Sequence, residues 1–242
     1  MSPHPLAASG TLRVAINLGN PVLAQGEASA PRGASVWLAE RLAAALGLPH
    51  SLRAYPSAGA VVEDVARDAW DMAFLAIDPL RAEQIVFSAP YVEIEGTYVV
   101  REDSPAQRVA DLDQPGRRIA VGDGAAYDLF LRRALVHATL QRAPTSAAAV
   151  TLFHQRALDA AAGVRQPLQA WADTHPGHRV LPDRFTAIRQ AVAVPVGRDA
   201  QAVATLHAAL EQLKAGNGLA EAFARSGQGE VSLVRGGGAA AR

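Results

Sequence analysis

Arg81 is the side chain best placed to bind a ligand in this sequence. It follows the apolar segment 72–77 and the turn Asp78–Pro79, a pattern typical of a buried strand that enters a loop. A guanidinium at such a position can hold a carboxylate through two parallel, charge-assisted hydrogen bonds. Lys214 is the only lysine among the 23 basic residues, so a solitary arginine carries little information in this chain. The alternative interpretation is therefore that Arg81 solvates a helix start or pairs with Glu83.

A second anion-binding segment is predicted at Gly124, Ala125 and Ala126, where an apolar strand gives way to a helix. The first amides of a helix have no partner within the helix and attract negative charge. An ordinary strand-to-helix turn is the alternative interpretation of these residues.

The composition excludes several classes of function. The chain has 242 residues, of which 50% are hydrophobic and 19% charged, enough for one large core or two modest ones. Lys+Arg and Asp+Glu number 23 each, so the net charge is zero and we expect no nucleic-acid partner. The absence of cysteine excludes thiol nucleophiles, disulfides and thiolate zinc sites.

Membrane insertion is not expected, because no apolar run approaches the roughly 18 to 20 residues that span a bilayer. The segment Met1–Gly10 has neither the basic region nor the apolar core of a secretory signal. The sequence as it stands thus fits a cytoplasmic protein if Met1 is the native start, or a protein whose signal has been removed.

The residue pattern predicts an α/β fold with mostly parallel sheets, because strands and helices alternate. The first set has strands at 11–18, 50–55 and 72–77 and helices at 35–47 and 58–70, with Ser35 as the first N-cap. Extended runs follow at 84–88, 92–100 and 190–196. A shorter second set has helices at 105–112, 125–138, 146–157 and 166–174 and strands at 117–121, 139–142, 158–162 and 178–181. Helices at 200–215 and 219–225 and a mobile tail at 236–242 complete the prediction.

The segment 80–91, LRAEQIVFSAPY, resembles the TPERxxxVDFSxPY signature of the type II extracellular solute-binding proteins, in the amino-acid-binding family of ABC transporters. Further family features occur in the expected order: GTLRVAI, LAERLAAALGL, DMAFLAI, DLDQPGRRIAVGDGAA, RALDAAAG and AVAVPVGRD. The resemblance covers roughly residues 10–234.

This resemblance implies a type II periplasmic-binding-protein-like fold of two α/β lobes. Lobe I would comprise 1–100 and 191–242, and lobe II 101–190. Crossover strands near 98–102 and 191–194 would join them, with a ligand cleft between the lobes that closes by hinge motion. The resemblance also implies a monomer in the periplasm that delivers its ligand to an ABC permease.

The sequence departs from the family pattern where a ligand's amino group is held. Val164 stands where the family has the aspartate that binds the α-ammonium, and Phe74 and Ala76 stand where a glycine and a threonine or serine contact it. Ala125 replaces a hydroxyl residue that assists the ligand carboxylate. The family's aromatic platform after the first strand is missing, which leaves Asn17 and Asn20 as polar candidates.

An unpaired buried ammonium is costly, whereas a carboxylate facing Arg81 and helix amides is satisfied. We therefore predict a small organic anion without an amino group, or a relic that binds poorly. The predicted ligand-binding residues lie at strand ends and at one helix start: Arg81, Asn17, Phe74, Ala76, Asp78, Gly124, Ala125, Ala126 and Val164.

Two other function classes stay open. A dehydratase resembling the cyclohexadienyl dehydratases would use a carboxylate from Glu93, Glu95 or Asp123 as general acid. An intracellular ligand-sensing module is the other class, and it needs a partner chain. No residue is assigned as catalytic, and a nucleotide cofactor is not expected because GDGAA lacks the spacing of a dinucleotide fingerprint.

The histidines and two aspartates are assigned to other roles. No histidine pairs with an acidic residue at a metal-ligand spacing, so no metal site is predicted. Asp71 and Asp159 each precede a predicted strand, and both are interpreted as structural.

Overall fold

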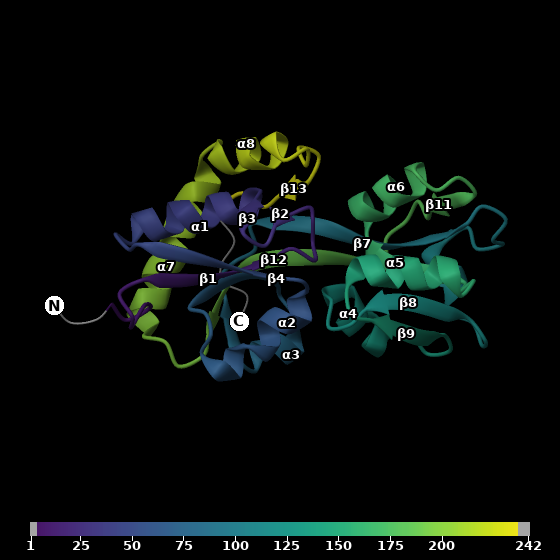
Figure 1. The fold of residues 1–242 in the computed structure, drawn as a ribbon, viewed down its shortest axis with the longest axis horizontal. Coiled ribbons are helices and arrows are strands. Elements are labelled where there is room, and N and C mark those ends of the chain that lie inside the picture. The colour runs from purple at the N-terminus through teal and green to yellow at the C-terminus, as the bar shows by residue number, and fades with distance from the viewer. Residues whose placement is uncertain (1–3, 237–242) are drawn as a thin grey trace. The chain divides into compact units, whose positions relative to one another are not determined.

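The computed structural model describes residues 4–236 and divides the chain into two compact units (Figure 1). Unit 1 comprises 1–93 and 189–242, and unit 2 comprises 94–188. The chain passes from one unit to the other twice, in β7 (Val92–Arg101) and in β12 (Thr186–Pro195). Residues 237–242 of the predicted mobile tail lie outside the described residues.

Unit 1 is built on a mixed sheet. Strands β4 (His50–Tyr55), β1 (Leu12–Asn17) and β5 (Met72–Ala76) are parallel neighbours, and β12 pairs antiparallel with β5 and with β6 (Ile85–Phe87). Helices α1 (Ala34–Ala45), α7 (Ala200–Ala215) and α8 (Gly218–Arg225) pack against one another. In Figure 1, α1 and α8 lie above the strands, and α2 (Ala58–Glu63) and α3 (Pro79–Ala82) lie below them. The helices thus cover both faces of a sheet whose central strands are buried.

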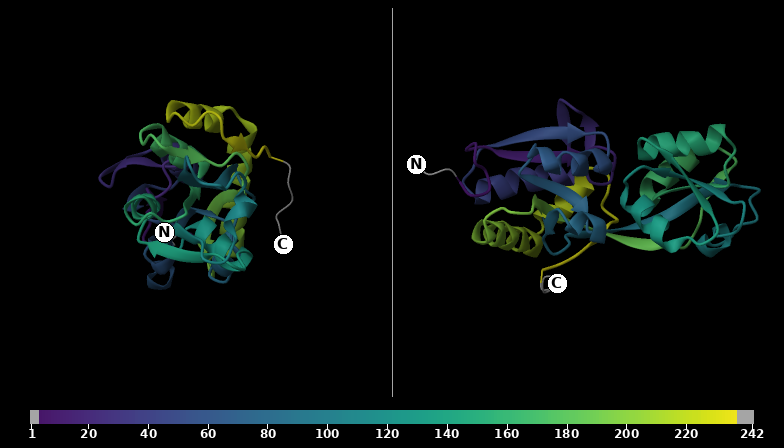
Figure 2. Two further views of the ribbon diagram at one scale, coloured as in Figure 1. Left: turned by 90° about the vertical axis from the view of Figure 1, so that its right-hand side faces the viewer. Right: turned by 90° about the horizontal axis from the view of Figure 1, so that it is seen from below.

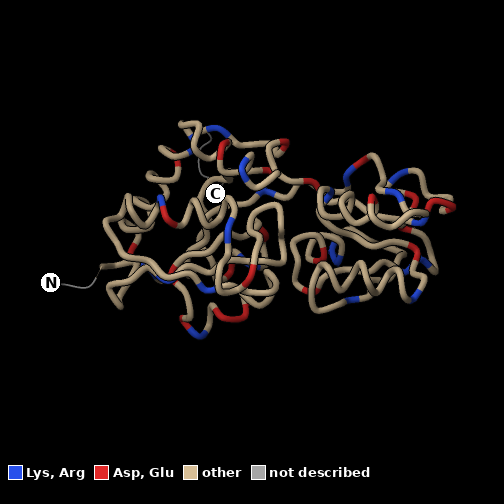
Figure 3. Tube along the Cα trace, turned by 45° about the horizontal axis from the view of Figure 1, so that its top comes forward, with Lys and Arg blue, Asp and Glu red and all other residues tan. Residues whose placement is uncertain are grey.

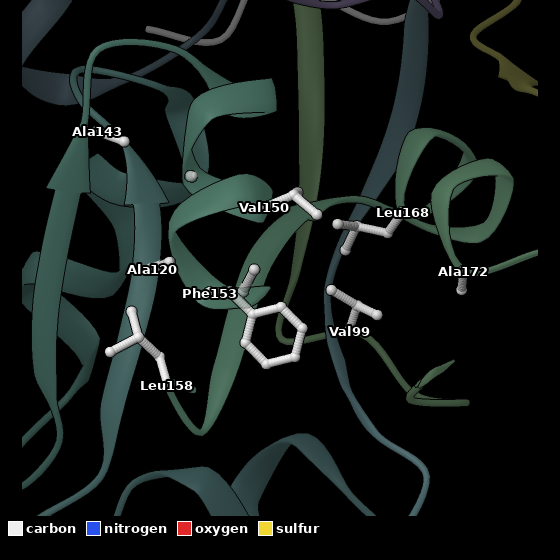
Figure 4. Close-up of a cluster of buried hydrophobic side chains, with 10 residues drawn as sticks. Val99, Ala120, Ala143, Val150, Phe153, Leu158, Leu168 and Ala172 are labelled. Carbon is white, nitrogen blue, oxygen red and sulfur yellow. The ribbon is translucent and has the colours of Figure 1, made fainter. Parts of the chain in front are cut away.

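Unit 2 has the sheet order β7-β10-β8-β9, in which β10 (Ala160–Val164), β8 (Arg118–Gly122) and β9 (Thr139–Ala143) are parallel. Strand β7 runs antiparallel to β10 and to β11 (His178–Val180). Helices α4 (Ala126–Ala134), α5 (Ser146–Gln155) and α6 (Arg165–Asp173) complete the unit. Phe153, Leu158 and Leu168 belong to its apolar core, which Figure 4 shows.

An aspartate joins two parallel strands in the same way in each unit. Asp71 accepts hydrogen bonds from the backbone N–H of Arg13 at 2.9 Å and from its guanidinium at 2.9 and 2.7 Å. Asp159 accepts from the backbone N–H of Arg118 at 2.8 Å and from the Arg117 guanidinium at 2.7 Å. Both carboxylates therefore align a pair of strands, and the predicted structural role is confirmed.

The start of α1 differs from the prediction. The helix begins at Ala34, with Gly33 as N-cap, and Ser35 lies inside the first turn, where its N–H donates to the Leu23 carbonyl at 2.9 Å. Gly33 has φ 113°, and a Cβ there would lie 2.8 Å from the Leu23 oxygen. Glycine is required at this position because the loop and the helix start approach so closely.

The predicted helix 58–70 is shorter in the structure. Helix α2 ends at Glu63, a 3₁₀ turn follows at Val65–Arg67, and Asp68 adopts a left-handed conformation with φ 49°. The break lets Trp70 enter the core, where its indole N–H donates to the Val61 carbonyl at 2.9 Å. The predicted helix 105–112 is likewise only the 3₁₀ turn Val109–Leu112.

Three short elements were not predicted: the hairpin of β2 (Gln25–Glu27) and β3 (Ala30–Arg32), helix α3, and β13 (Ser232–Leu233). Charges of both signs are interspersed along both units, in keeping with the zero net charge (Figure 3). Within the described part of the chain, no helix has the length and apolar character that a bilayer crossing requires.

Candidate functional site

Arg81 lies in α3, the single turn that follows β5 in unit 1. Asp78 caps this turn by accepting a hydrogen bond from the Leu80 N–H at 2.9 Å, and Pro79 occupies the first helical position. The turn reverses the chain, so the Arg81 guanidinium reaches back to the end of β5 and donates from Nη1 to the Ala76 carbonyl at 3.0 Å. Arg81, Asp78 and Ala76 are thus brought together at the end of β5.

Arg81 is a buried cation. Only 3% of the residue is exposed. Burial lowers the pKa of its guanidinium to about 10, while the nearby charge of Asp78 acts in the opposite direction. The side chain therefore remains protonated at neutral pH, and a second anion beside it would offset part of its desolvation.

Phe74 occupies a different environment. It is 2% exposed and packs edge-on against Tyr91, with ring centroids 6.2 Å apart. Its side chain belongs to the core of unit 1, whereas Ala76 presents its carbonyl to Arg81. Neither residue offers a side-chain acceptor for an ammonium group.

Asn17 ends β1, a parallel neighbour of β5, so it lies at the same edge of the sheet as the end of β5. Its Oδ1 accepts from the Gly19 N–H at 2.9 Å, which leaves the amide NH₂ as the group that can donate to a ligand. Gly19 is confined by its surroundings, because a Cβ there would lie 2.6 Å from the Pro56 oxygen.

In unit 2, the segment 124–126 connects β8 to α4. Gly124 has φ 65°, and its N–H donates to Asp128 Oδ2 at 3.1 Å. The Ala125 N–H donates to the Gly122 carbonyl at 3.1 Å, and Ala125 is the N-cap of α4 without a side-chain cap. The predicted anion-binding amides are therefore reduced to those of the first helical turn, beginning at Ala126.

Asp128 is a residue that the sequence analysis missed. It is fully buried in the first turn of α4 and pairs with Arg142, with 3.1 Å between Oδ1 and Nη2. Its charge stabilises the helix start but competes there with an incoming anion. Its position three residues after the N-cap was the available sequence signal.

The end of β10 carries no carboxylate. Val164 is the last residue of the strand and the N-cap of α6. Arg165 follows, and it donates to Glu95 Oε2 at 2.6 Å and to the carbonyls of Leu181, Pro182 and Asp183. Arg165 thus fastens the segment 181–183 to α6, a role that the sequence analysis also missed.

The three carboxylates considered as general acids each lie beside an arginine. The distances are 3.6 Å for Glu93–Arg189, 2.6 Å for Glu95–Arg165 and 3.6 Å for Asp123–Arg142. Each of these carboxylates is therefore paired with an arginine side chain.

Three of the four histidines of unit 2 gather around one tryptophan ring. His175 stacks on Trp171 with ring centroids 4.1 Å apart, and His154 and His178 lie at 6.0 and 4.8 Å from the same ring. Across residues 4–236, no group of three or more histidine, cysteine or acidic side chains could hold a metal ion.

The sequence matches the family model of the bacterial extracellular solute-binding proteins, family 3, over residues 12–227. Among curated proteins, no sequence matches this chain.

Several solved structures share the fold. The amino acid ABC transporter substrate-binding protein AbpA from Streptococcus pneumoniae, bound to L-arginine, superposes with TM-score 0.77 at 18% identity, over 93% of this chain and 98% of that one. The ancestral amino-acid-binding protein AncCDT-1, a precursor of cyclohexadienyl dehydratase, gives TM-score 0.75 at 20% identity over 90% and 95% of the two chains. A histidine kinase sensor domain similar to periplasmic binding proteins gives TM-score 0.77 at 21% identity over 93% and 98%.

Proposed function

The chain belongs to the bacterial extracellular solute-binding proteins, family 3, and from this premise we propose that it binds a small carboxylate-bearing solute without an amino group. Arg81 of unit 1 is the anion anchor in this proposal. The first-turn amides of α4 in unit 2 are the second anion-binding group, and the Asn17 amide contributes to specificity.

The composition of the strand ends carries the proposal. A buried guanidinium lies at the end of β5 and provides a strong donor to a carboxylate. At the ends of β5 and β10, Ala76 and Val164 supply no side-chain oxygen, and the residue after Val164 is an arginine. At the positions of Ala76 and Val164, a ligand ammonium would therefore lose its water without gaining a side-chain acceptor from either residue.

The transport role is part of the same proposal. AbpA is a substrate-binding protein of an amino acid ABC transporter, and by analogy this chain would deliver its solute to an ABC permease from the periplasm. It would act as a non-catalytic binding protein in which the two units close on the solute by hinge motion.

A thermal-shift screen tests the ligand class. The compounds are 2-keto acids and 2-hydroxy acids, each beside the amino acid with the same side chain, together with dicarboxylates and prephenate. A ligand at about 100 times its Kd stabilises by about 2.7 kcal/mol, which corresponds to about 5 to 10 °C for a chain of this size.

Arg81→Lys is the informative variant, because it keeps the charge of the buried cation and removes the paired donors of the guanidinium. The shift with the keto or hydroxy acid should fall strongly in Arg81→Lys and stay unchanged in Arg156→Ala, which removes an exposed arginine of unit 2. A larger shift with the amino acids than with their deaminated counterparts would contradict the ligand class. Consumption of prephenate in the same samples would contradict a non-catalytic role.

A further inference from the structure

Unit 1 contains a hollow of about 440 Å³ that is separate from Arg81 and its surroundings. The hairpin β2–β3, helix α1 and helix α8 border it, and these elements lie near one another in Figure 1. Its lining includes Gln25, Arg32, Trp37, Arg225 and Ser226. A volume of this size falls within the range of about 300 to 1,000 Å³ that is usual for small-molecule sites.

Specific contacts hold the walls of this hollow together. Gln25 Nε2 donates to the Pro21 carbonyl at 2.9 Å and to the Ser226 carbonyl at 3.0 Å, so one side chain ties the hairpin to the end of α8. Gln25 also lies opposite Arg32 in the register of the hairpin. The hairpin, which is too short to be stable alone, is thereby fixed as a wall of the hollow.

Trp37 is held in place on the side of α1. A Cβ added to Gly218 at the start of α8 would lie 2.7 Å from its ring, so the glycine lets the helix backbone approach the indole closely. The Arg41 guanidinium lies 5.9 Å from the ring centroid. The half-buried indole is therefore an ordered aromatic surface within the lining.

The lining has an excess of positive charge in a chain whose net charge is zero. It includes two arginines, Arg32 and Arg225, and no carboxylate. Glu221, one turn away on α8, pairs with Arg225 at 3.4 Å, but both side chains are more than half exposed and such pairs are weak. A hollow of about 210 Å³ in unit 2 differs in this respect, because its two arginines are balanced by two aspartates and one pair, Arg117–Asp159, is closed at 2.7 Å.

From this arrangement we propose that the hollow between the β2–β3 hairpin, α1 and α8 is a second ligand site, for a small aromatic carboxylate. The carboxylate is held by Arg32 and Arg225, and the aromatic ring lies against Trp37. The site lies within unit 1 and does not include Arg81. This proposal can therefore be tested independently of the solute site proposed above.

The test is calorimetric titration of the full chain with 2-naphthoate at low ionic strength. The uncharged 2-naphthalenemethanol serves as the matched probe. The variant Arg32→Gln/Arg225→Gln removes both cations of the lining, and Trp37→Leu removes the aromatic surface. Arg108→Gln/Arg156→Gln removes two exposed arginines of unit 2 and keeps the overall charge change the same. All titrations are repeated in Arg81→Lys.

We expect saturable binding of 2-naphthoate that weakens about tenfold or more in Arg32→Gln/Arg225→Gln, because hydrogen bonds between charged groups are lost. Trp37→Leu should also weaken binding, while Arg108→Gln/Arg156→Gln and Arg81→Lys leave it unchanged and 2-naphthalenemethanol binds more weakly. Absence of saturable binding, equal loss in the two double variants, or loss in Arg81→Lys alone would overturn the proposal. Unchanged thermal unfolding of each variant confirms that a lost signal reports the site and not the fold.

Discussion

At the scale of single residues, arginine side chains have different roles in this protein, depending on their burial and their partners. Arg13 is committed to Asp71, which accepts three of its N–H groups and raises the pKa of its guanidinium above the usual value. Arg81, by contrast, is almost fully buried, and burial lowers its pKa. An arginine that fastens strands and a buried arginine at a strand end thus differ in burial and in the direction in which the pKa is shifted.

From the environment of His207 we predict that the stability of the fold depends on pH. Burial in α7 lowers the pKa of its imidazole below the ordinary value of 6.5, while the charge of Glu211 acts in the opposite direction. Between the lowered pKa and 6.5 the unfolded chain binds more protons than the folded chain, so stability is lost as the pH falls through this window. Urea unfolding at pH 7.5 and at pH 5.5 measures the effect. The free energy of unfolding should fall less between the two pH values in His207→Gln than in the unchanged chain.

His137→Gln is the control for this measurement, because His137 is exposed. The reduction in the loss of stability on acidification should be larger in His207→Gln than in this control. An equal loss in His207→Gln would show that another group carries the pH dependence in this range.

At the scale of elements, Gly122 fixes how closely β8 approaches α5. A Cβ at this position would lie 2.8 Å from the backbone nitrogen of Ser146 and 2.9 Å from the Tyr127 hydroxyl. The backbone at the start of α5 cannot move far enough to relieve this clash without disturbing the helix. Gly122→Ala should therefore destabilise unit 2 by about 1 to 3 kcal/mol. Urea unfolding of Gly122→Ala and of the unchanged chain, followed by far-UV circular dichroism, measures this difference.

Gly229→Ala is the matched control, because its added Cβ would meet only ordinary contacts at 3.7 Å. A change in Gly122→Ala no larger than that in Gly229→Ala would show that the end of β8 adapts without strain.

The elements that the sequence predicted best are those whose signal is local. Helix α7 spans Ala200–Ala215 as expected, and β4 spans His50–Tyr55. The break after α2 was missed because it depends on the left-handed Asp68 and on the burial of Trp70, which the apolar pattern does not encode. The hairpin β2–β3 was missed because its strands have three residues each and are mostly exposed.

In the candidate site, too, the features with a local sequence signal could be predicted and those that depend on distant contacts could not. The place of Arg81 after a strand and a proline turn could be predicted from adjacent residues. The role of Arg165 could not, because its partner Glu95 lies 70 residues away in the chain. Asp128 was missed because its partner Arg142 comes from a different element. Contacts between distant segments decide which charged residues are committed to the fold.

At the scale of the whole molecule, the chain is organised into one discontinuous and one continuous unit (Figure 2). Unit 2 holds the parallel strands β10, β8 and β9 at one end of the long mixed sheet, and it has its own aspartate pairing of parallel strands and its own apolar core. Its length is that of a small independent domain. Unit 1 is assembled from both ends of the chain, so β12, α7 and α8 join it only after unit 2 has been synthesised.

We therefore predict that the fragment 94–188 folds alone. Thermal unfolding of the fragment, followed by far-UV circular dichroism and by Trp171 fluorescence, should give one cooperative transition with both probes, because the core around Phe153 lies wholly within it. Phe153→Ala removes a fully buried ring at a cost of about 3 to 5 kcal/mol and should abolish that transition in so small a unit. A fragment that unfolds without cooperativity, or whose unfolding ignores Phe153→Ala, would show that the core of unit 2 forms only when β7 and β12 are anchored in unit 1.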